Sequence, residues 1–254
     1  MFDLRLIAAD VLKLRRRRGM LSISLLLTLG GIALAFIVMA IQHAGNPAEY
    51  GPAGGLENYQ NMIAFVGAMA LVVGAIIGGT AGTQDLESGV FRDLAATGRS
   101  RTALFASRTA AALVVVLAIV GVTAVFTGAA SVALAGSLAA PGAGALAAGT
   151  VGVLVTAALS VAMAVGLSVL VASRGPVIGI LLGFYLAISP LLIGMGSLGG
   201  ARQAIPEVAV KRIGDLPPAA GDLHVALVTA ILVVVAWSAA ALGLGAWRTV
   251  TREI

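Results

Sequence analysis

The sequence predicts an all-α, polytopic membrane protein with six transmembrane helices. Apolar residues make up 59% of the 254-residue chain and charged residues only 11%, whereas a soluble globular domain carries roughly 25% charged residues. The mean hydropathy is +1.05. Several apolar runs reach the length of about 20 residues that a helix needs to cross the hydrocarbon core. We therefore expect a single transmembrane domain over residues 1–254.

The predicted spans follow the apolar runs, which are rich in Gly, Ala, Ser and Thr. Small residues let helix backbones approach closely in lipid, where no hydrophobic force drives helices together. The third run is long enough to tilt or to break near Thr127 and Gly128. The runs cover residues 20–41, 62–82, 109–135, 147–171, 176–197 and 224–247.

Two GxxxG spacings lie within these runs, at Gly74–Gly78–Gly82 and at Gly179–Gly183. Such spacings are frequent by chance in a chain with 33 glycines. We interpret them as packing within the bundle, and a dedicated dimer face is the alternative.

Lysine and arginine are distributed unevenly between the two sides of this topology. With the N-terminus inside, three basic residues lie in outer segments, Arg202, Lys211 and Arg212. The positive-inside rule then places both termini and the segment 83–108 in the cytoplasm. Basic residues beside apolar runs also explain the net charge of +5 without a nucleic-acid partner. The inner segments hold Arg5, Lys13, Arg15, Arg16, Arg17, Arg18, Arg92, Arg99, Arg101, Arg108, Arg174, Arg248 and Arg252.

Residues 1–18 are predicted to form an amphipathic helix in the membrane interface, ahead of a first span that is retained rather than cleaved. The alternative is a frayed basic tail. The apolar face holds Leu4, Ile7, Ala8, Val11 and Leu12, and the polar face holds Asp3, Asp10, Lys13 and Arg17.

The chain lacks the residues that several membrane functions require. The apolar runs carry essentially no ionisable residue, which argues against an ion-driven pump. Neither Lys13 nor Lys211 stands in a phosphate-binding loop, and His43 and His224 are too far apart for a zinc pair. Ser168 lacks the second glycine of a G-x-S-G nucleophile motif, so we expect it to pack between helices. We expect no catalytic, cofactor or metal site and no enzyme activity.

The segment 83–108 is the one polar stretch between two long apolar runs. Asp85 and Glu87 can start or prolong a helix, because acids are favourable near its positive end. An apolar strip follows, made of Val90, Phe91 and Leu94.

This polar stretch also contains the signals that end one helix and begin another. Gly98 offers a left-handed stop, and Ser100 can cap the helix that follows. We expect a short amphipathic helix parallel to the membrane, which would present a docking surface to a partner. The alternative is a solvated connector with snorkelling arginines.

The whole topology resembles that of the permease subunits of type-2 ATP-binding cassette transporters. In that family a degenerate motif marks the cytoplasmic segment after the second span, and Arg108 replaces a lysine that many members carry a turn later. Here the motif positions are Glu87, Gly89, Arg92, Leu94, Thr97, Gly98, Ser100 and Arg101.

The resemblance implies a coupling helix that docks on a separate cytoplasmic ATPase subunit, and this subunit would bind the ATP. It also implies a second permease, identical or homologous, and a place among the lipids of the plasma membrane, in a bacterium. The implied coupling residues are Asp85, Glu87, Gly89, Phe91, Arg92, Asp93, Leu94, Arg99, Ser100 and Arg101.

The outer segment 198–223 contains the signals of a short helix. Pro206 and Glu207 suit its first turn, and Lys211 and Arg212 suit its end before Gly214. An external lid, which members of the family often carry, and an ordinary loop helix are equally open interpretations.

These observations predict the membrane subunit of an ATP-driven exporter of a lipid-like, peptide or drug-like substrate. One alternative is a non-transporting scaffold or sensor that recruits a cytoplasmic protein. Another is a secondary carrier with sites in broken helices, for which Ser189 and Pro190 offer slight support.

Overall fold

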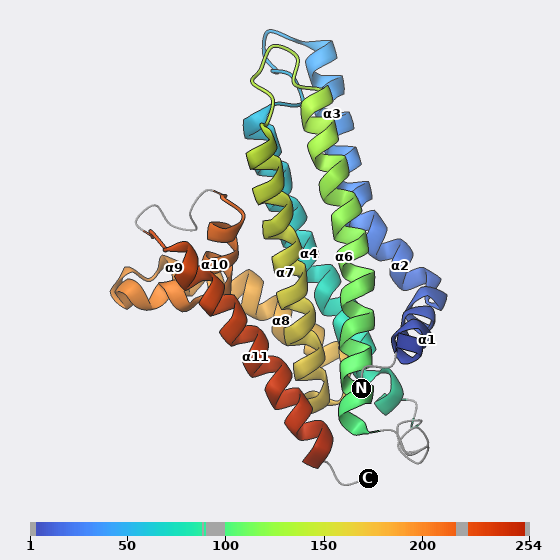
Figure 1. Ribbon diagram of the computed structural model, residues 1–254. Coiled ribbons are helices and arrows are strands. Elements are labelled where there is room, and N and C mark those ends of the chain that lie inside the picture. The colour runs from blue at the N-terminus through green and yellow to red at the C-terminus, as the bar shows by residue number, and fades with distance from the viewer. Residues whose placement is uncertain (1–3, 88, 90–99, 217–222, 252–254) are drawn as a thin grey trace.

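The computed structural model describes residues 4–87, 89, 100–216 and 223–251, and every regular element in these ranges is a helix (Figure 1). Six helices in this part of the chain are long and apolar enough to cross a membrane. The prediction of an all-α protein with six candidate spans is thus confirmed.

The first span is Arg18–Gly45 and the fifth is Arg174–Gly194, and each contains one π-helical turn. The other four are single α-helices. In chain order the elements are α1 (Leu4–Arg16), α2 (Arg18–Leu25), a π turn (Leu26–Gly30), α3 (Gly31–Gly45), α4 (Leu56–Glu87), α6 (Arg101–Ala133), α7 (Ala143–Val171), α8 (Arg174–Gly183), a π turn (Phe184–Ile188), α9 (Ser189–Gly194), a 3-10 helix (Gly196–Ala204), α10 (Pro206–Ile213) and α11 (Leu227–Thr251).

Several helices extend beyond the apolar runs that predicted them. Residues 83–87 continue α4, and residues 101–108 are the first turns of α6. Of the two possibilities expected for the third run, the break near Thr127 and Gly128 is wrong, because α6 is helical through both residues, and the tilt stays a prediction. The Thr127 hydroxyl donates to the carbonyl of Thr123 at 2.8 Å. The hydroxyl group is therefore satisfied within the helix.

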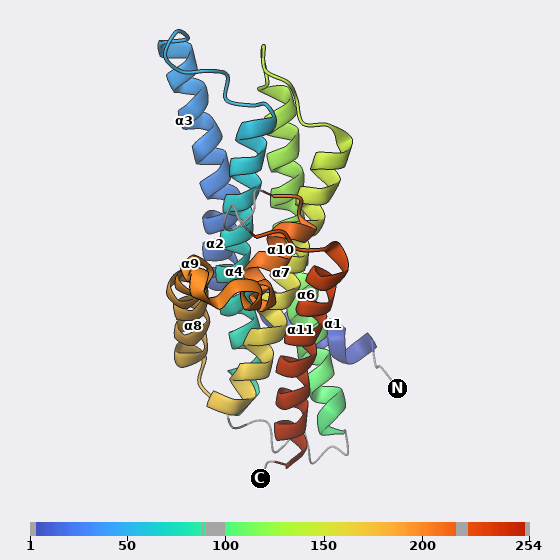
Figure 2. The same cartoon turned by 90° about the vertical axis from the view of Figure 1, so that its left-hand side faces the viewer.

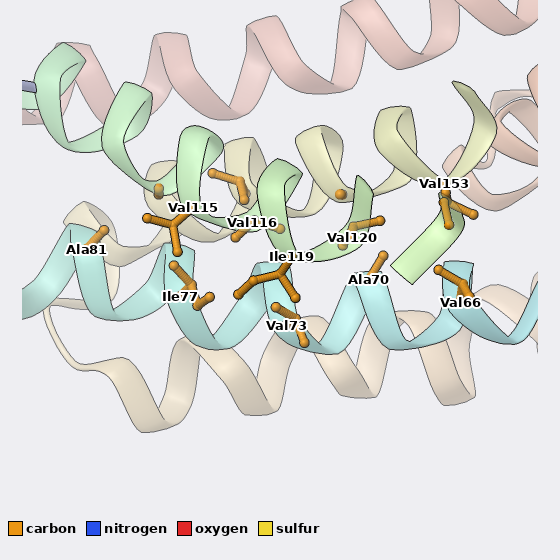
Figure 3. Packing of buried hydrophobic residues seen from close by; sticks show 14 of the residues in the cluster. Val66, Ala70, Val73, Ile77, Ala81, Val115, Val116, Ile119, Val120 and Val153 are labelled. Carbon is orange, nitrogen blue, oxygen red and sulfur yellow. The ribbon is translucent and has the colours of Figure 1, made fainter. Parts of the chain in front are cut away.

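The main core lies where α4, α6 and α7 pack together (Figure 3). Buried apolar residues follow one face of α4 at helical spacing, and they include Val66, Ala70, Val73 and Ile77. Figure 3 shows Ile119 of α6 lying beside Ile77 and Val73. The helices α6 and α7, which pack on α4, thus bury a continuous apolar stripe along it.

The glycines of the first GxxxG spacing bring α4 against α7 in the same chain. A Cβ atom added at Gly74 would lie 2.7 Å from Cβ of Ser160, and one added at Gly78 would lie 2.8 Å from Cβ of Ala164. The Ser160 hydroxyl donates to the carbonyl of Leu71 across this contact at 2.8 Å. Packing within the bundle is therefore the role of this motif, as small residues at helix crossings predict.

The second GxxxG spacing has a different environment. A Cβ atom added at Gly179 or Gly183 of α8 would meet no atom within 4 Å. The interpretation as packing within the bundle is wrong for this pair. The alternative of a dimer face stays a prediction.

The ends of several elements gather at one end of the bundle, which we call the basic end (Figures 1 and 2). There lie α1, the end of α4, the start of α6, the connection from α7 to α8 and the end of α11. Part way along the bundle, α10 lies beside α7. The expected short helix of the outer segment is observed as α10, with Pro206 at its start and Lys211 in its last turn.

Candidate functional site

The candidate site is the basic end, where the flanks of the segment 83–108 meet the rest of the chain. The residues described on these flanks are Asp85 and Glu87 at the end of α4, Gly89 just beyond it, and Ser100 and Arg101 at the start of α6. The other predicted coupling residues lie outside the described residues, as does the expected short helix. They are Phe91, Arg92, Asp93, Leu94 and Arg99.

Asp85 is the centre of a group of charged side chains that we call the polar cluster. Its carboxylate oxygen Oδ2 lies 2.7 Å from Nη2 of Arg108 in α6 and 3.6 Å from Nζ of Lys13 in α1. Lys13 also contacts the carboxylate of Asp10 at 3.0 Å. The Ser107 hydroxyl donates to the second oxygen of Asp10 at 2.7 Å. The polar cluster, Asp10, Lys13, Asp85, Ser107 and Arg108, thus joins three elements.

The polar cluster is balanced in charge and is buried around Asp85 and Arg108, whereas the side chain of Lys13 is 39% exposed. The side chains of Asp85 and Arg108 are each only 9% exposed. Two carboxylates face two cations, so the burial leaves no net charge without a partner. Such a balance matters, because an uncompensated buried charge is strongly destabilising. The structure therefore gives Asp85 partners within the chain.

The cluster also determines how α1 is oriented. Asp10 and Lys13 lie on the side of α1 that faces the spans, and Leu14 is buried on that side. The side chains of Leu4 and Leu12 are exposed. Asp10 and Lys13 therefore contact the bundle together with Val11 and Leu14, while Leu4 and Leu12 are left outside.

Glu87 connects the end of α4 to the fifth span. Its carboxylate Oε1 accepts a hydrogen bond from the backbone N–H of Arg174 at 3.1 Å. Arg174 is the first residue of α8, so the carboxylate lies at the positive end of that helix, where an anion is stabilised. Gly89 follows with a φ of +72°, a backbone conformation that favours glycine.

Ser100 and Arg101 fix the start of α6. The Ser100 hydroxyl accepts a hydrogen bond from the backbone N–H of Ala103 at 3.2 Å, which confirms the predicted cap. The Arg101 guanidinium donates to the carbonyl of Val250 at 3.3 Å. This carbonyl belongs to the last turn of α11, where a cation is favourable.

Three of the predicted residues therefore contact three different parts of the bundle. Asp85 contacts α1 and α6, Glu87 contacts α8, and Arg101 contacts α11. The flanks of the segment 83–108 are thus tied to the third, fifth and sixth spans and to α1. A displacement of this segment would act on all of them.

The charges at this end are evident in the sequence, but their pairing is not. Asp10, Lys13 and Arg108 were not expected among the coupling residues, although they surround Asp85. One signal was present: two acids, Asp85 and Glu87, at the end of the second span, in a chain with a basic helix ahead of the first. Two acids and two basic residues at the ends of three neighbouring helices favour such a cluster, namely Asp10, Lys13, Asp85 and Arg108.

A protein-family model described as "ABC-2 family transporter protein" matches residues 6–190 of this chain. The match covers α1 to the first residues of α9, and it therefore includes the polar cluster, Glu87 and Arg101. A search of curated proteins found no match. The matched range is more than half of the 254 residues.

A family match of this extent, together with six candidate spans, identifies a multi-pass membrane protein that is an ABC permease. Membership of this family implies a partnership with an ABC ATPase subunit. The chain belongs to the ABC-2 family of transporter proteins.

Proposed function

We propose that the chain is the permease subunit of an ATP-driven exporter and works as a dimer. A separate cytoplasmic ATPase subunit binds and hydrolyses the ATP, and it docks on the segment 83–108. The observation that supports this mechanism most directly is the set of contacts made by Asp85, Glu87 and Arg101. Each joins the flanks of one short segment to a different part of the bundle.

Contacts of this kind can transmit a movement of the segment 83–108 to the spans. The α4 and α6 helices continue as helices up to Glu87 and from Arg101. A force on the segment between them therefore acts on the ends of two long helices rather than on loose connections. Because packed cores repack between discrete arrangements rather than deform continuously, a displacement at one end can reach the whole bundle.

The proposed orientation of the chain in the membrane follows from the distribution of its basic residues. The basic end would face the cytoplasm of a bacterial cell, as the positive-inside rule predicts. On this orientation α1 would lie in the interface, with the exposed Leu4 and Leu12 in contact with lipid.

The dimer of the proposal is supported by the exposed glycines of α8. Gly175, Gly179 and Gly183 stand one helical turn apart, and an added Cβ would meet nothing within 4 Å at any of them. A second copy of the chain could approach this face as closely as α7 approaches α4. Substrate would then pass along the interface between the two copies, lined by small residues of spans 1, 2 and 5.

The proposal is tested by co-purification of the chain with the ATPase subunit. Glu87→Arg and Arg92→Glu reverse charges on the segment 83–108, and we expect each to reduce the amount of ATPase subunit recovered. Glu49→Arg is the matched control, because Glu49 is an exposed acid in the connection between α3 and α4, at the opposite end of the bundle. Full recovery with both reversals would contradict docking at this segment.

Two further measurements distinguish the alternative functions. A scaffold would bind its partner without changing the rate at which the partner hydrolyses ATP. A secondary carrier would move its substrate in vesicles that contain no ATPase subunit.

A further inference from the structure

A cavity of about 330 Å³ lies between α4, α7, the fifth span and α10. Ligand sites in proteins begin at about 300 Å³, so the cavity is large enough for a small ligand or for one end of a larger one. Its mouth is formed by exposed residues of two spans, Ala64 and Ala68 of α4 and Leu186 and Pro190 of the fifth span. The cavity therefore opens sideways from the bundle, between these spans.

The inner walls of this cavity are mostly apolar, with Thr156 and Tyr185 among the lining residues, and its charges come from one element. Val153 of α7 and Leu71 of α4 line the walls. Glu207 and Lys211 reach the cavity from α10, one helical turn apart. An apolar wall with a few convergent polar groups is the usual composition of a ligand site.

The position of α10 is fixed by close packing on both sides. A Cβ atom added at Gly152 of α7 would lie 2.5 Å from Cα of Gly214, just beyond the end of α10. On another side of α10, Val208 and Ala209 are buried in an apolar cluster that includes Ala230 of α11. The packing of α10 against α7 and α11 therefore holds Glu207 and Lys211 at the cavity.

Glu207 and Lys211 form an ion pair with Nζ 3.3 Å from Oε1. The buried hydroxyl of Ser189 in the fifth span donates to the other carboxylate oxygen at 2.8 Å. The two charged side chains are 23% and 33% exposed. An ammonium has three donors, so Lys211 can keep this contact and bind a ligand anion at the same time.

We propose that this cavity binds the polar end of a zwitterionic amphiphile. The cationic group of the ligand lies at Glu207, its anionic group lies at Lys211, and its alkyl tail follows the apolar wall toward the mouth. The reason is charge balance: the pair has no net charge, so a ligand with a single charge would add an uncompensated charge to a partly buried site. This inference rests on the proposed function, because it assigns the substrate class of the same permease.

The test compares three amphiphiles that share one alkyl tail and differ in the head group. Native mass spectrometry of the chain, purified in the neutral detergent dodecyl maltoside, counts bound dodecylphosphocholine, dodecyltrimethylammonium or dodecyl phosphate. We expect the zwitterion to bind about tenfold more tightly than either charged probe, a difference of roughly 1.4 kcal/mol.

Two variants, each lacking one charge of the pair, should prefer opposite charged probes. Glu207→Gln leaves the lysine alone and should favour the anionic probe, and Lys211→Met leaves the carboxylate alone and should favour the cation. A merely structural role for the pair would instead weaken the binding of all three probes equally in both variants. That result would overturn the proposal, as would equal binding of the three probes to the unchanged chain.

A third variant tests the location without touching a charge. Ala68→Trp places a large side chain at the mouth and should reduce the binding of the zwitterion at least tenfold. Val125→Trp is its control, because Val125 is an exposed residue of α6 that does not line the cavity. Binding that survives Ala68→Trp unchanged would place the ligand elsewhere and overturn the proposal.

The same preparations separate this inference from the function on which it rests. If the chain assembles with its ATPase subunit but shows no preference for the zwitterion, the substrate class is wrong and the permease function stands. If the unchanged chain does not assemble with the ATPase subunit, the proposed function fails whatever the chain binds.

Discussion

The carboxylate of Asp85 lies 2.7 Å from the guanidinium of Arg108, and both side chains are almost completely buried. This ion pair joins the end of the second span to the start of the third at the point where the segment 83–108 leaves the bundle. Lys13 adds α1 to the same contact at 3.6 Å. The two ends of the connection between these spans are therefore held to each other, and Asp85 is also held to α1.

Asp85→Asn should destabilise the chain, because it leaves Arg108 and Lys13 facing a neutral amide. Breaking a buried pair by removing one partner typically costs about 3–5 kcal/mol, and we expect a loss near the lower value because Lys13 can still contact Asp10. The midpoint of thermal unfolding in detergent measures this loss.

The control for this variant is Asp215→Asn. Asp215 is 78% exposed and lies 3.9 Å from Arg212, so its removal should change stability by less than about 1 kcal/mol. An unfolding midpoint that moves equally in the two variants would show that the buried pair has no special role.

Glu87→Ala removes the acceptor of the hydrogen bond from Arg174 and should separate coupling from stability. Glu87 is exposed and stabilises the first turn of α8 through one hydrogen bond, so the free energy of unfolding should fall by less than about 1 kcal/mol. The rate of ATP hydrolysis by the assembled complex should fall by a larger factor than this loss of stability would give. A variant that hydrolyses ATP at the full rate would show that the contact with α8 is not used.

Gly78→Leu should disturb the contact between α4 and α7, because even the Cβ atom would lie 2.8 Å from Cβ of Ala164. Overpacking of a tight interface costs roughly 1–3 kcal/mol. We expect a lower midpoint of thermal unfolding and a smaller yield of monodisperse protein. An unchanged midpoint would mean that the two helices can separate without cost.

Gly179→Leu tests the dimer, because a Cβ atom added at this glycine would meet no atom of the described residues within 4 Å. The stability of the single chain should be unchanged or slightly higher, since leucine favours a helix more than glycine does, by about 1 kcal/mol. The fraction of dimer measured by native mass spectrometry should fall. A dimer fraction equal to that of the unchanged chain would place the interface on another face.

Hydropathy predicts the number of spans well and their ends less well. The apolar runs report the residues that contact hydrocarbon, but a helix also continues where polar residues have partners. Residues 83–87 and 101–108 include charged residues and are still helical, because Asp85 is paired with Arg108 and Ser100 caps the start of α6. The cap was predictable from local chemistry, as was α10 with Pro206 at its start.

The pairing of charges and the cavity could not be predicted in the same way. Asp10 and Ser107 are far apart in the sequence, and only the packing of α1 against α6 brings them within hydrogen-bond distance. The prediction of a short helix with Glu207 in its first turn and Lys211 near its end is confirmed. Their position at a cavity depends on how α10 packs on α7 and α11, which no local pattern encodes.

The rate of ATP hydrolysis in reconstituted vesicles tests the central claim most directly, namely that the chain receives its energy from another subunit through the segment 83–108. The account predicts no hydrolysis by the chain alone and a changed rate when the chain joins its ATPase subunit. Arg92→Glu should return that rate to the value of the ATPase subunit alone. Hydrolysis by the isolated chain, or an unaltered rate in the Arg92→Glu complex, would contradict it.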